Sequence, residues 1–129
     1  MCLKTSSKGR NNPKTDINVY KVLLHLDDGR ILAPFTFHEY KLDRVLIDQE
    51  KEEIEKNHAY KLIGSGYFHA CTSLYKAKEL AKDMKRLRIN GRKILIRIHR
   101  AIIPCKTKYY TNNKGSICAK SIKVLSVCV

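Results

Sequence analysis

The chain has 129 residues, of which 43% are hydrophobic, which is enough for one domain with one hydrophobic core. Lysine and arginine number 26 against 12 acidic residues, and the resulting formal net charge of +14 favours an anionic partner. No apolar run approaches the ~20 residues that cross a bilayer, and the polar N-terminus does not resemble a secretory signal. We therefore expect no membrane partner.

The five cysteines are odd in number and widely spaced, and they include no Cys-x-x-Cys pair. Without a secretory signal, this pattern indicates reduced thiols in a cytosolic setting. His69 and Cys71 form a His-x-Cys pair, which is a poor zinc signature and lacks the third group that a catalytic Cys-His pair needs. The sequence predicts no metal site, no cofactor and no catalytic residue.

Residues 1–16 carry four basic residues and one acid, together with Pro13, and predict a flexible basic arm. The arm could lie along a phosphate backbone or thread into an assembly, and the alternative is a frayed terminus. A single domain is expected over residues 17–129. It begins with a hairpin, in which strands at 18–26 and 31–33 flank an Asp-Asp-Gly-Arg turn. The aromatic stretch 35–40 is interpreted as a hydrophobic plug against the sheet, with base stacking as the alternative.

Residues 41–60 hold six acids and four bases, and the segment 48–57 is interpreted as a short exposed helix or an acidic loop. General acid–base chemistry by its glutamates would need burial, which nothing in the sequence predicts. After a strand at 59–63, Gly64-Ser65-Gly66 breaks regular structure, and 67–71 reads as a strand. Apolar residues then recur at helical spacing, and they predict one main amphipathic helix over residues 73–87.

Residues 93–104 predict a strong strand, because Ile94, Ile96 and Ile98 alternate with residues expected to face water. A loop is expected at 106–116 and a last strand at 117–129. The fold class is therefore α+β: a twisted, mainly antiparallel sheet of five or six strands with the helix packed on one face.

Basic residues concentrate between residues 76 and 100, where ten bases and two acids leave a net charge of +8. If the outer helix face and the following strand converge, these side chains form a patch that contacts phosphates without reading bases. The alternative is that helix and strand point their charges in different directions. The predicted nucleic-acid-binding residues are Lys76, Lys82, Lys85, Arg86, Arg88, Arg92, Arg97 and Arg100.

Several motifs resemble a group of small uncharacterised proteins encoded by tailed phages and prophages. They are Met1-Cys2-Leu3, the strand Val19-Tyr-Lys-Val-Leu23, Ala33-Pro-Phe35, Gly66-Tyr-Phe-His-Ala-Cys-Thr-Ser-Leu74, Ile103-Pro104 before Tyr109-Tyr110, and Ser121-Ile-Lys-Val-Leu125. The resemblance covers most of the chain beyond residue 16. It implies a phage setting, in the host cytoplasm or the virion.

The order of elements is also similar to that of ADP-ribosyltransferase-like folds, which implies a first-strand His or Arg, a polar position on the next core strand, and a late Glu. His25 matches the first position, and Thr72 or Ser73 the second. The late Glu has no counterpart, because no acid follows Asp83. This resemblance implies at most a degenerate version of such an enzyme.

These observations predict a non-enzymatic phage accessory protein that binds nucleic acid or an acidic phage or host protein through a basic surface. The first alternative is a virion structural or auxiliary capsid component. The second alternative is a nucleotide-acting enzyme of degenerate ADP-ribosyltransferase-like type.

Overall fold

The computed structural model describes residues 3–5, 14–34, 38–56, 61–64, 66–84 and 94–129. Within these ranges the chain forms one helix and eleven strands. In chain order they are β1 (Leu3–Thr5), β2 (Ile17–His25), β3 (Ile31–Leu32), β4 (Val45–Ile47), β5 (Ile54–Lys56), β6 (Lys61–Ile63), β7 (Phe68–Cys71), α1 (Leu74–Asp83), β8 (Leu95–Ile103), β9 (Tyr109–Thr111), β10 (Ser116–Ala119) and β11 (Ser121–Val127).

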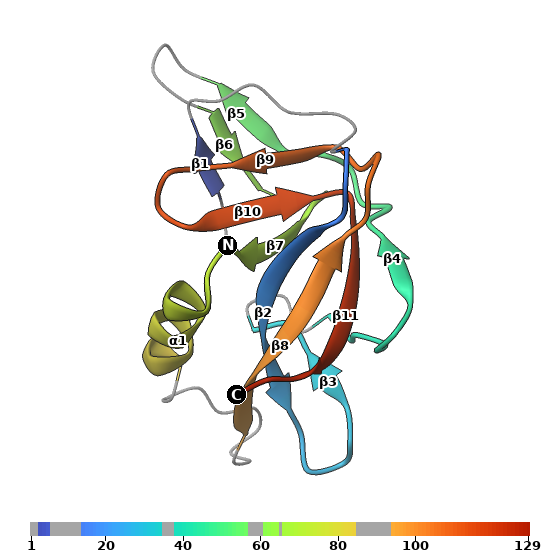
Figure 1. Ribbon diagram of the computed structural model, residues 1–129, viewed down its shortest axis with the longest axis vertical. Helices are drawn as coiled ribbons and strands as arrows, with labels where there is room; N and C mark the ends of the chain where they lie inside the picture. Colours follow the sequence, from blue (N-terminus) through green and yellow to red (C-terminus); the bar gives the residue numbers. More distant parts are fainter. Residues whose placement is uncertain (1–2, 6–13, 35–37, 57–60, 65, 85–93) are drawn as a thin grey trace.

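The strands form two antiparallel sheets, so the predicted α+β class is confirmed. The larger sheet has eight strands in the order β4-β11-β8-β2-β7-β10-β9, with β3 paired to β2, and the smaller has the order β1-β6-β5. In Figure 1, β2, β8 and β11 run along the long axis of the molecule, whereas β7, β9 and β10 run across it. The predicted count of five or six strands is wrong, because many of the strands have only two to four residues and carry no readable periodicity.

The central pair of the larger sheet is β2 with β8, which are in register from Ile17↔Ile103 to His25↔Leu95. Side chains alternate between the faces of a strand, so Val19 and Leu23 enter one core while Val22 packs toward α1. On β8 the alternation differs from the prediction. His99 belongs to the set expected to face water, but it is fully buried, because the middle of β8 is covered on both faces.

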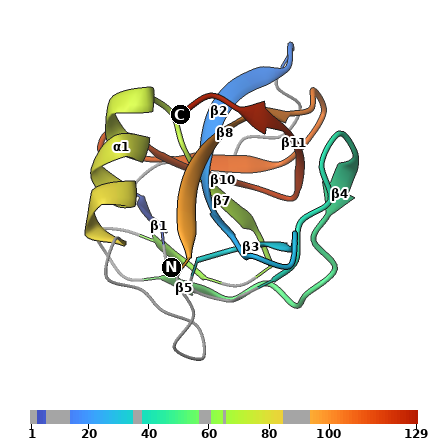
Figure 2. The same cartoon turned by 90° about the horizontal axis from the view of Figure 1, so that it is seen from below.

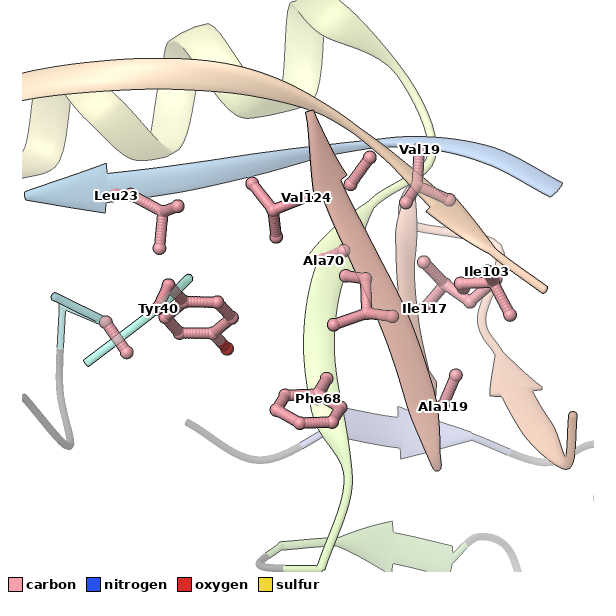
Figure 3. Packing of buried hydrophobic residues seen from close by; sticks show 12 residues of the cluster. Val19, Leu23, Tyr40, Phe68, Ala70, Ile103, Ile117, Ala119 and Val124 are labelled. Carbon is pink, nitrogen blue, oxygen red and sulfur yellow. The ribbon is translucent and has the colours of Figure 1, made fainter. Parts of the chain in front are cut away.

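The main core lies on the face of β2 and β8 opposite α1. Figure 3 shows Leu23, Val124, Ile117 and Phe68 pointing into it, with the Tyr40 ring beside Leu23. The Tyr40 and Phe68 rings meet edge to face, with centroids 6.0 Å apart. Of the predicted aromatic plug, Tyr40 is buried against the core but His38 is exposed, and residues 35–37 lie outside the described part of the chain.

The helix α1 begins where the side chain of Ser73 accepts a hydrogen bond from the backbone N–H of Lys76. Its buried side is formed by Ala77, with Leu80 half-buried beside it, and Met84 caps the C-terminal end. The predicted helix extended to residue 87, but residues 85–87 lie outside the described part of the chain. Within that part, no helix is long and apolar enough to span a membrane.

The smaller sheet changes the interpretation of two segments. Leu3–Thr5, expected in a flexible arm, forms β1, because Leu3 and Thr5 are buried and pair with Ile63 and Lys61 of β6. The division into an arm and a single domain stays a prediction. For the segment 48–57 the sequence predicts a short exposed helix or an acidic loop. Residues 48–53 form a loop, whereas Ile54 packs into the second core and pairs with Ile63 as part of β5, so the helix is wrong in the described residues.

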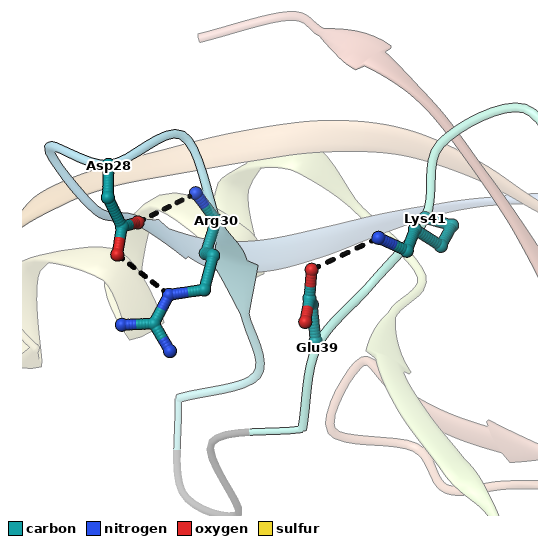
Figure 4. Close-up of polar contacts among 4 residues, drawn as sticks. All are labelled: Asp28, Arg30, Glu39 and Lys41. Atoms are coloured by element: carbon teal, nitrogen blue, oxygen red, sulfur yellow. Dashed lines mark hydrogen bonds and ion pairs between the residues drawn. The ribbon is translucent and has the colours of Figure 1, made fainter.

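The structure also tests the predicted first hairpin and the predicted last strand. The hairpin at residues 18–33 is confirmed, and its turn is held by Asp28, which pairs with the Arg30 guanidinium at 2.8 Å (Figure 4). The predicted last strand is two strands, β10 and β11, interrupted at Lys120, and the predicted loop before it contains β9. Figure 2 shows α1 and β4 on opposite sides of β2 and β8.

Two leucine truncations test which side chains hold the fold together. Leu23 is fully buried in the main core, so Leu23→Ala is expected to lower the free energy of unfolding by about 2–5 kcal/mol. Leu80 is only half-buried where α1 packs on the sheet, so Leu80→Ala is expected to lower the free energy of unfolding by a smaller amount. Urea denaturation of both variants measures the order, and a larger loss for Leu80→Ala would contradict this assignment of the core.

Candidate functional site

The larger sheet divides between two neighbouring strands, β2 and β7. They pair at one position only, Tyr20↔Cys71. Beyond it, the rest of β2 pairs with β8 and β3, whereas Phe68–Cys71 pairs with β10. The two halves of the sheet therefore diverge after Tyr20, and side chains rather than backbone hydrogen bonds fill the space between them.

A cavity of about 840 Å³ lies along this division. We call it the Lys21 cavity, and its inner wall contains Lys21, Tyr40, Phe68, His69 and Ala70. These residues come from β2, from β7 and from the segment before β4, so chain regions far apart in the sequence build one site. Its volume lies in the range of pockets that take small organic ligands.

Lys21 is the unusual residue of this cavity, because its side chain is only 7% exposed. Its Nζ donates a hydrogen bond to the carbonyl oxygen of His69 and lies 5.3 Å from the centroid of the Tyr40 ring. Both partners are uncharged at neutral pH, and within the described residues Lys21 has no ion pair with a carboxylate. Burial lowers its pKa from the ordinary 10.5 to about 8, and the neighbouring Cys71 opposes that change.

Two other titratable residues that line the cavity, His69 and Cys71, are neutral at pH 7. Burial lowers the pKa of His69 to about 4, although the hydrogen bond between its Nε2 and the Gly64 carbonyl oxygen, at 3.0 Å, opposes the change. Burial also raises the pKa of the Cys71 thiol, and Lys21 partly offsets this. A protonated thiol is a weak nucleophile, so the His69–Cys71 pair does not form an activated catalytic dyad.

A second group of charges surrounds two buried tyrosines. The rings of Tyr67 and Tyr110 meet edge to face with centroids 5.6 Å apart. Lys120 Nζ lies 4.8 Å from the Tyr67 ring, while Lys61 and Lys108 Nζ lie 5.9 and 5.7 Å from the Tyr110 ring. We call these three lysines and two tyrosines the lysine–tyrosine cluster. Cation–π contacts fix the ammonium groups without neutralising their charge.

Glu52 is the carboxylate that pairs with this cluster, at 3.3 Å from Lys120 Nζ. Burial opposes its ionisation, but the Lys120 ammonium group and the nearby Tyr67 side chain outweigh burial and hold its pKa below the usual range. Lys120 also donates to the Gly66 carbonyl at 2.7 Å. Gly66 has a φ of +89°, and a Cβ there would lie 2.8 Å from the Glu52 Cα, so this tight contact requires glycine.

The structure describes four of the eight predicted nucleic-acid-binding residues, Lys76, Lys82, Arg97 and Arg100, and does not bring them into one patch. On β8, Arg97 is opposite Leu23 of the main core, whereas Arg100 is opposite Tyr20 on the helix side, so their side chains leave opposite faces of the sheet. Lys76 and Lys82 are on α1, and Lys76 pairs with Glu79 at 3.8 Å. Lys85, Arg86, Arg88 and Arg92 lie outside the described residues.

The residues that match the ADP-ribosyltransferase-like order are not brought together either. Ser73 caps α1, and Thr72 follows Cys71, the partner of Tyr20. His25 lies five residues beyond Tyr20 on β2, about 16 Å along the strand. There its Nε2 is 2.8 Å from Nε2 of His99, whose Nδ1 bonds the Leu125 carbonyl at 2.7 Å. That arrangement makes His25 a partner of the buried His99 imidazole rather than part of the Lys21 cavity.

The cavity and the lysine–tyrosine cluster were both missed by sequence reasoning. Lys21 stands in an apolar strand, and this was the available signal, because a lysine flanked by buried residues on a central strand has to find a polar partner. The cluster gives no such signal, since its lysines come from β6, the residue before β9 and the residue after β10. In the described residues, no three His, Cys, Asp or Glu side chains are arranged to hold a metal ion.

Replacing the buried lysine is expected to change how stability depends on pH. Between pH 8 and 10.5, the unfolded chain holds a proton on Lys21 that the folded chain has released, so the Lys21 contribution makes folding more favourable as pH rises. Relative to Lys21→Met, the wild-type protein should gain about 2 kcal/mol of unfolding free energy between pH 7.5 and 10. Urea denaturation at both pH values measures this difference.

The control is Lys78→Met, which removes an exposed lysine of α1 and should follow the wild-type pH dependence. Parallel curves for wild type and Lys21→Met would contradict a lowered pKa at Lys21.

Comparison with known proteins gives no relative from which a role can be transferred: no protein-family model, no curated protein and no solved structure matches this chain.

Proposed function

We propose that this protein is a non-enzymatic nucleic-acid-binding protein that contacts phosphates through lysine side chains. The observation that carries the proposal is the lysine–tyrosine cluster, where three ammonium groups gather around two adjacent rings and one of them pairs with Glu52. This excess of positive charge favours phosphate groups over neutral partners.

The cluster is suited to phosphate contacts rather than base recognition. Lys61, Lys108 and Lys120 are half-buried, and the tyrosine rings restrict their movement, so less side-chain freedom is lost on binding. Tyr67 and Tyr110 are 4% and 5% exposed, and such rings cannot stack on a nucleobase. Binding should therefore depend on charge and show little preference for sequence.

The described helix side supports the interface predicted from the sequence less well. In α1, three lysines stand against Glu79 and Asp83, a net charge of +1. Most of the predicted excess of positive charge in residues 76–100 belongs to residues 85–93, which the structure does not describe. The contribution of residues 85–93 to binding stays a prediction. The phage setting that the resemblance implies also stays a prediction.

The proposal is tested with two double variants, one that removes two lysine charges from the lysine–tyrosine cluster and one that removes two from α1. Lys61→Gln with Lys108→Gln is expected to weaken binding to a DNA duplex roughly tenfold at low salt and to make the log–log salt dependence less steep by about 2, because two phosphate contacts are lost. Fluorescence anisotropy across a salt series measures both quantities, and a second duplex of unrelated sequence should behave identically.

The matched control is Lys78→Gln with Lys82→Gln, which removes the same charge from the exposed face of α1. It should change binding much less. Equal losses in the two variants would mean that only net charge matters, and a larger loss in the α1 variant would return the interface to the predicted patch. Absence of binding by the wild-type protein at low salt would overturn the nucleic-acid proposal and leave an acidic phage or host protein as the partner to test.

A further inference from the structure

The Lys21 cavity is not explained by a surface that binds phosphates. Its inner wall is built from buried apolar and aromatic side chains, with Phe68 and Ala70 on β7 and Tyr40 facing them. The edge-to-face contact of Tyr40 and Phe68 makes one wall aromatic and fixed in position. Such a wall suits the planar, apolar body of a small molecule and offers nothing to a nucleic-acid backbone.

Among the described residues of the inner wall, Lys21 carries the charged group. Its partners, the His69 carbonyl and the Tyr40 ring, carry no formal charge, so the positive charge of a lysine that is 7% exposed is not compensated by a carboxylate among the described residues. Lys76 also lines the cavity, but it pairs with Glu79 on α1. A buried cation with neutral partners favours an anionic ligand.

The opening of the cavity limits the charge that such a ligand can carry. Asp48, Glu50 and Glu53 line it and are half-buried or exposed, so they lie toward solvent rather than in the inner wall. Their carboxylates repel a ligand with several negative charges and have less effect on one that carries a single charge deep inside. Polyphosphates and nucleic-acid strands are therefore disfavoured.

We propose that the Lys21 cavity binds a small, planar apolar molecule that carries one anionic group, a carboxylate or a sulfonate, and that this group meets Lys21 Nζ. The ring system lies against Tyr40 and Phe68, and the anion supplies the negative charge that pairs with the Lys21 ammonium group. Tyr67 of the lysine–tyrosine cluster also lines this cavity. The anion of the ligand meets Lys21 rather than the lysines of the cluster, so this binding does not depend on phosphate contacts there.

A pair of fluorescent dyes with the same ring skeleton tests this assignment. The probes are 8-anilinonaphthalene-1-sulfonate, which carries one negative charge, and N-phenyl-1-naphthylamine, which carries none. The folded wild-type protein is expected to bind one equivalent of the sulfonate dye at least tenfold more tightly than the neutral dye. In Lys21→Met, which keeps the apolar stem and removes the charge, the two affinities should become similar.

Two control variants separate the cavity from other positive charge. Lys78→Met removes an exposed lysine, and Lys61→Gln with Lys108→Gln removes two from the lysine–tyrosine cluster; both should bind the sulfonate dye as the wild-type protein does. Loss of dye binding in the cluster variant would overturn the cavity assignment without affecting the nucleic-acid proposal. Equal affinity of the wild-type protein for both dyes would overturn the role of Lys21.

A measurement on the unmodified protein keeps the test independent of whether Lys21→Met folds. Amide NMR spectra recorded with increasing sulfonate dye are expected to show shifts at Lys21, Tyr40 and Phe68, and little change at Lys61 and Lys108. Shifts confined to the lysine–tyrosine cluster or to α1 would overturn the proposal.

Discussion

The single pairing of Tyr20 with Cys71 is the constraint on which the rest of the structure depends. A sheet with more bridges between β2 and β7 would be continuous, and its side chains would close the space that the Lys21 cavity occupies. With only one bridge, the two halves diverge, and the His69 carbonyl on the open edge of β7 is satisfied by the Lys21 side chain. The hydrogen bond from Lys21 thus replaces a missing ladder bond, because a buried carbonyl requires a donor.

This solution is costly in free energy, which makes its presence informative. A lysine buried without a carboxylate loses hydration that a carbonyl and an aromatic ring only partly restore. A neutral donor at position 21 would satisfy the same carbonyl without that loss. A charged group is retained where a neutral one would be more stable, which fits the common finding that sites of function are less stable than their surroundings. Lys21 therefore fits a binding residue better than a purely structural one.

The sequence predicts the long elements well and the short ones poorly, for a physical reason. The strand at β2, the hairpin turn and the start of α1 carry local signals: apolar runs, Asp-Gly and the Ser73 cap. Strands such as β1 and β4 have three residues each, and what makes them strands is pairing with distant partners, β6 and β11. The two candidate sites arise from the same long-range pairing, so a sequence read locally can name Lys21 or Lys120 but cannot bring either to its neighbours.

The two sites also differ in how strongly dissolved salt screens their charges. The lysines of the cluster are partly exposed, so salt screens them and their attraction for phosphates falls as ionic strength rises. Lys21 is buried beside Tyr40 and the main core, where mobile ions screen its charge little. The strength of its contact with an anion therefore depends mainly on the cost of removing both charges from water. Under the two proposals, a chain with a net charge of +14 would combine a salt-sensitive surface for long anions with a salt-insensitive interior site for short ones, because the acidic side chains that line the cavity would repel the first class of ligand from the second site.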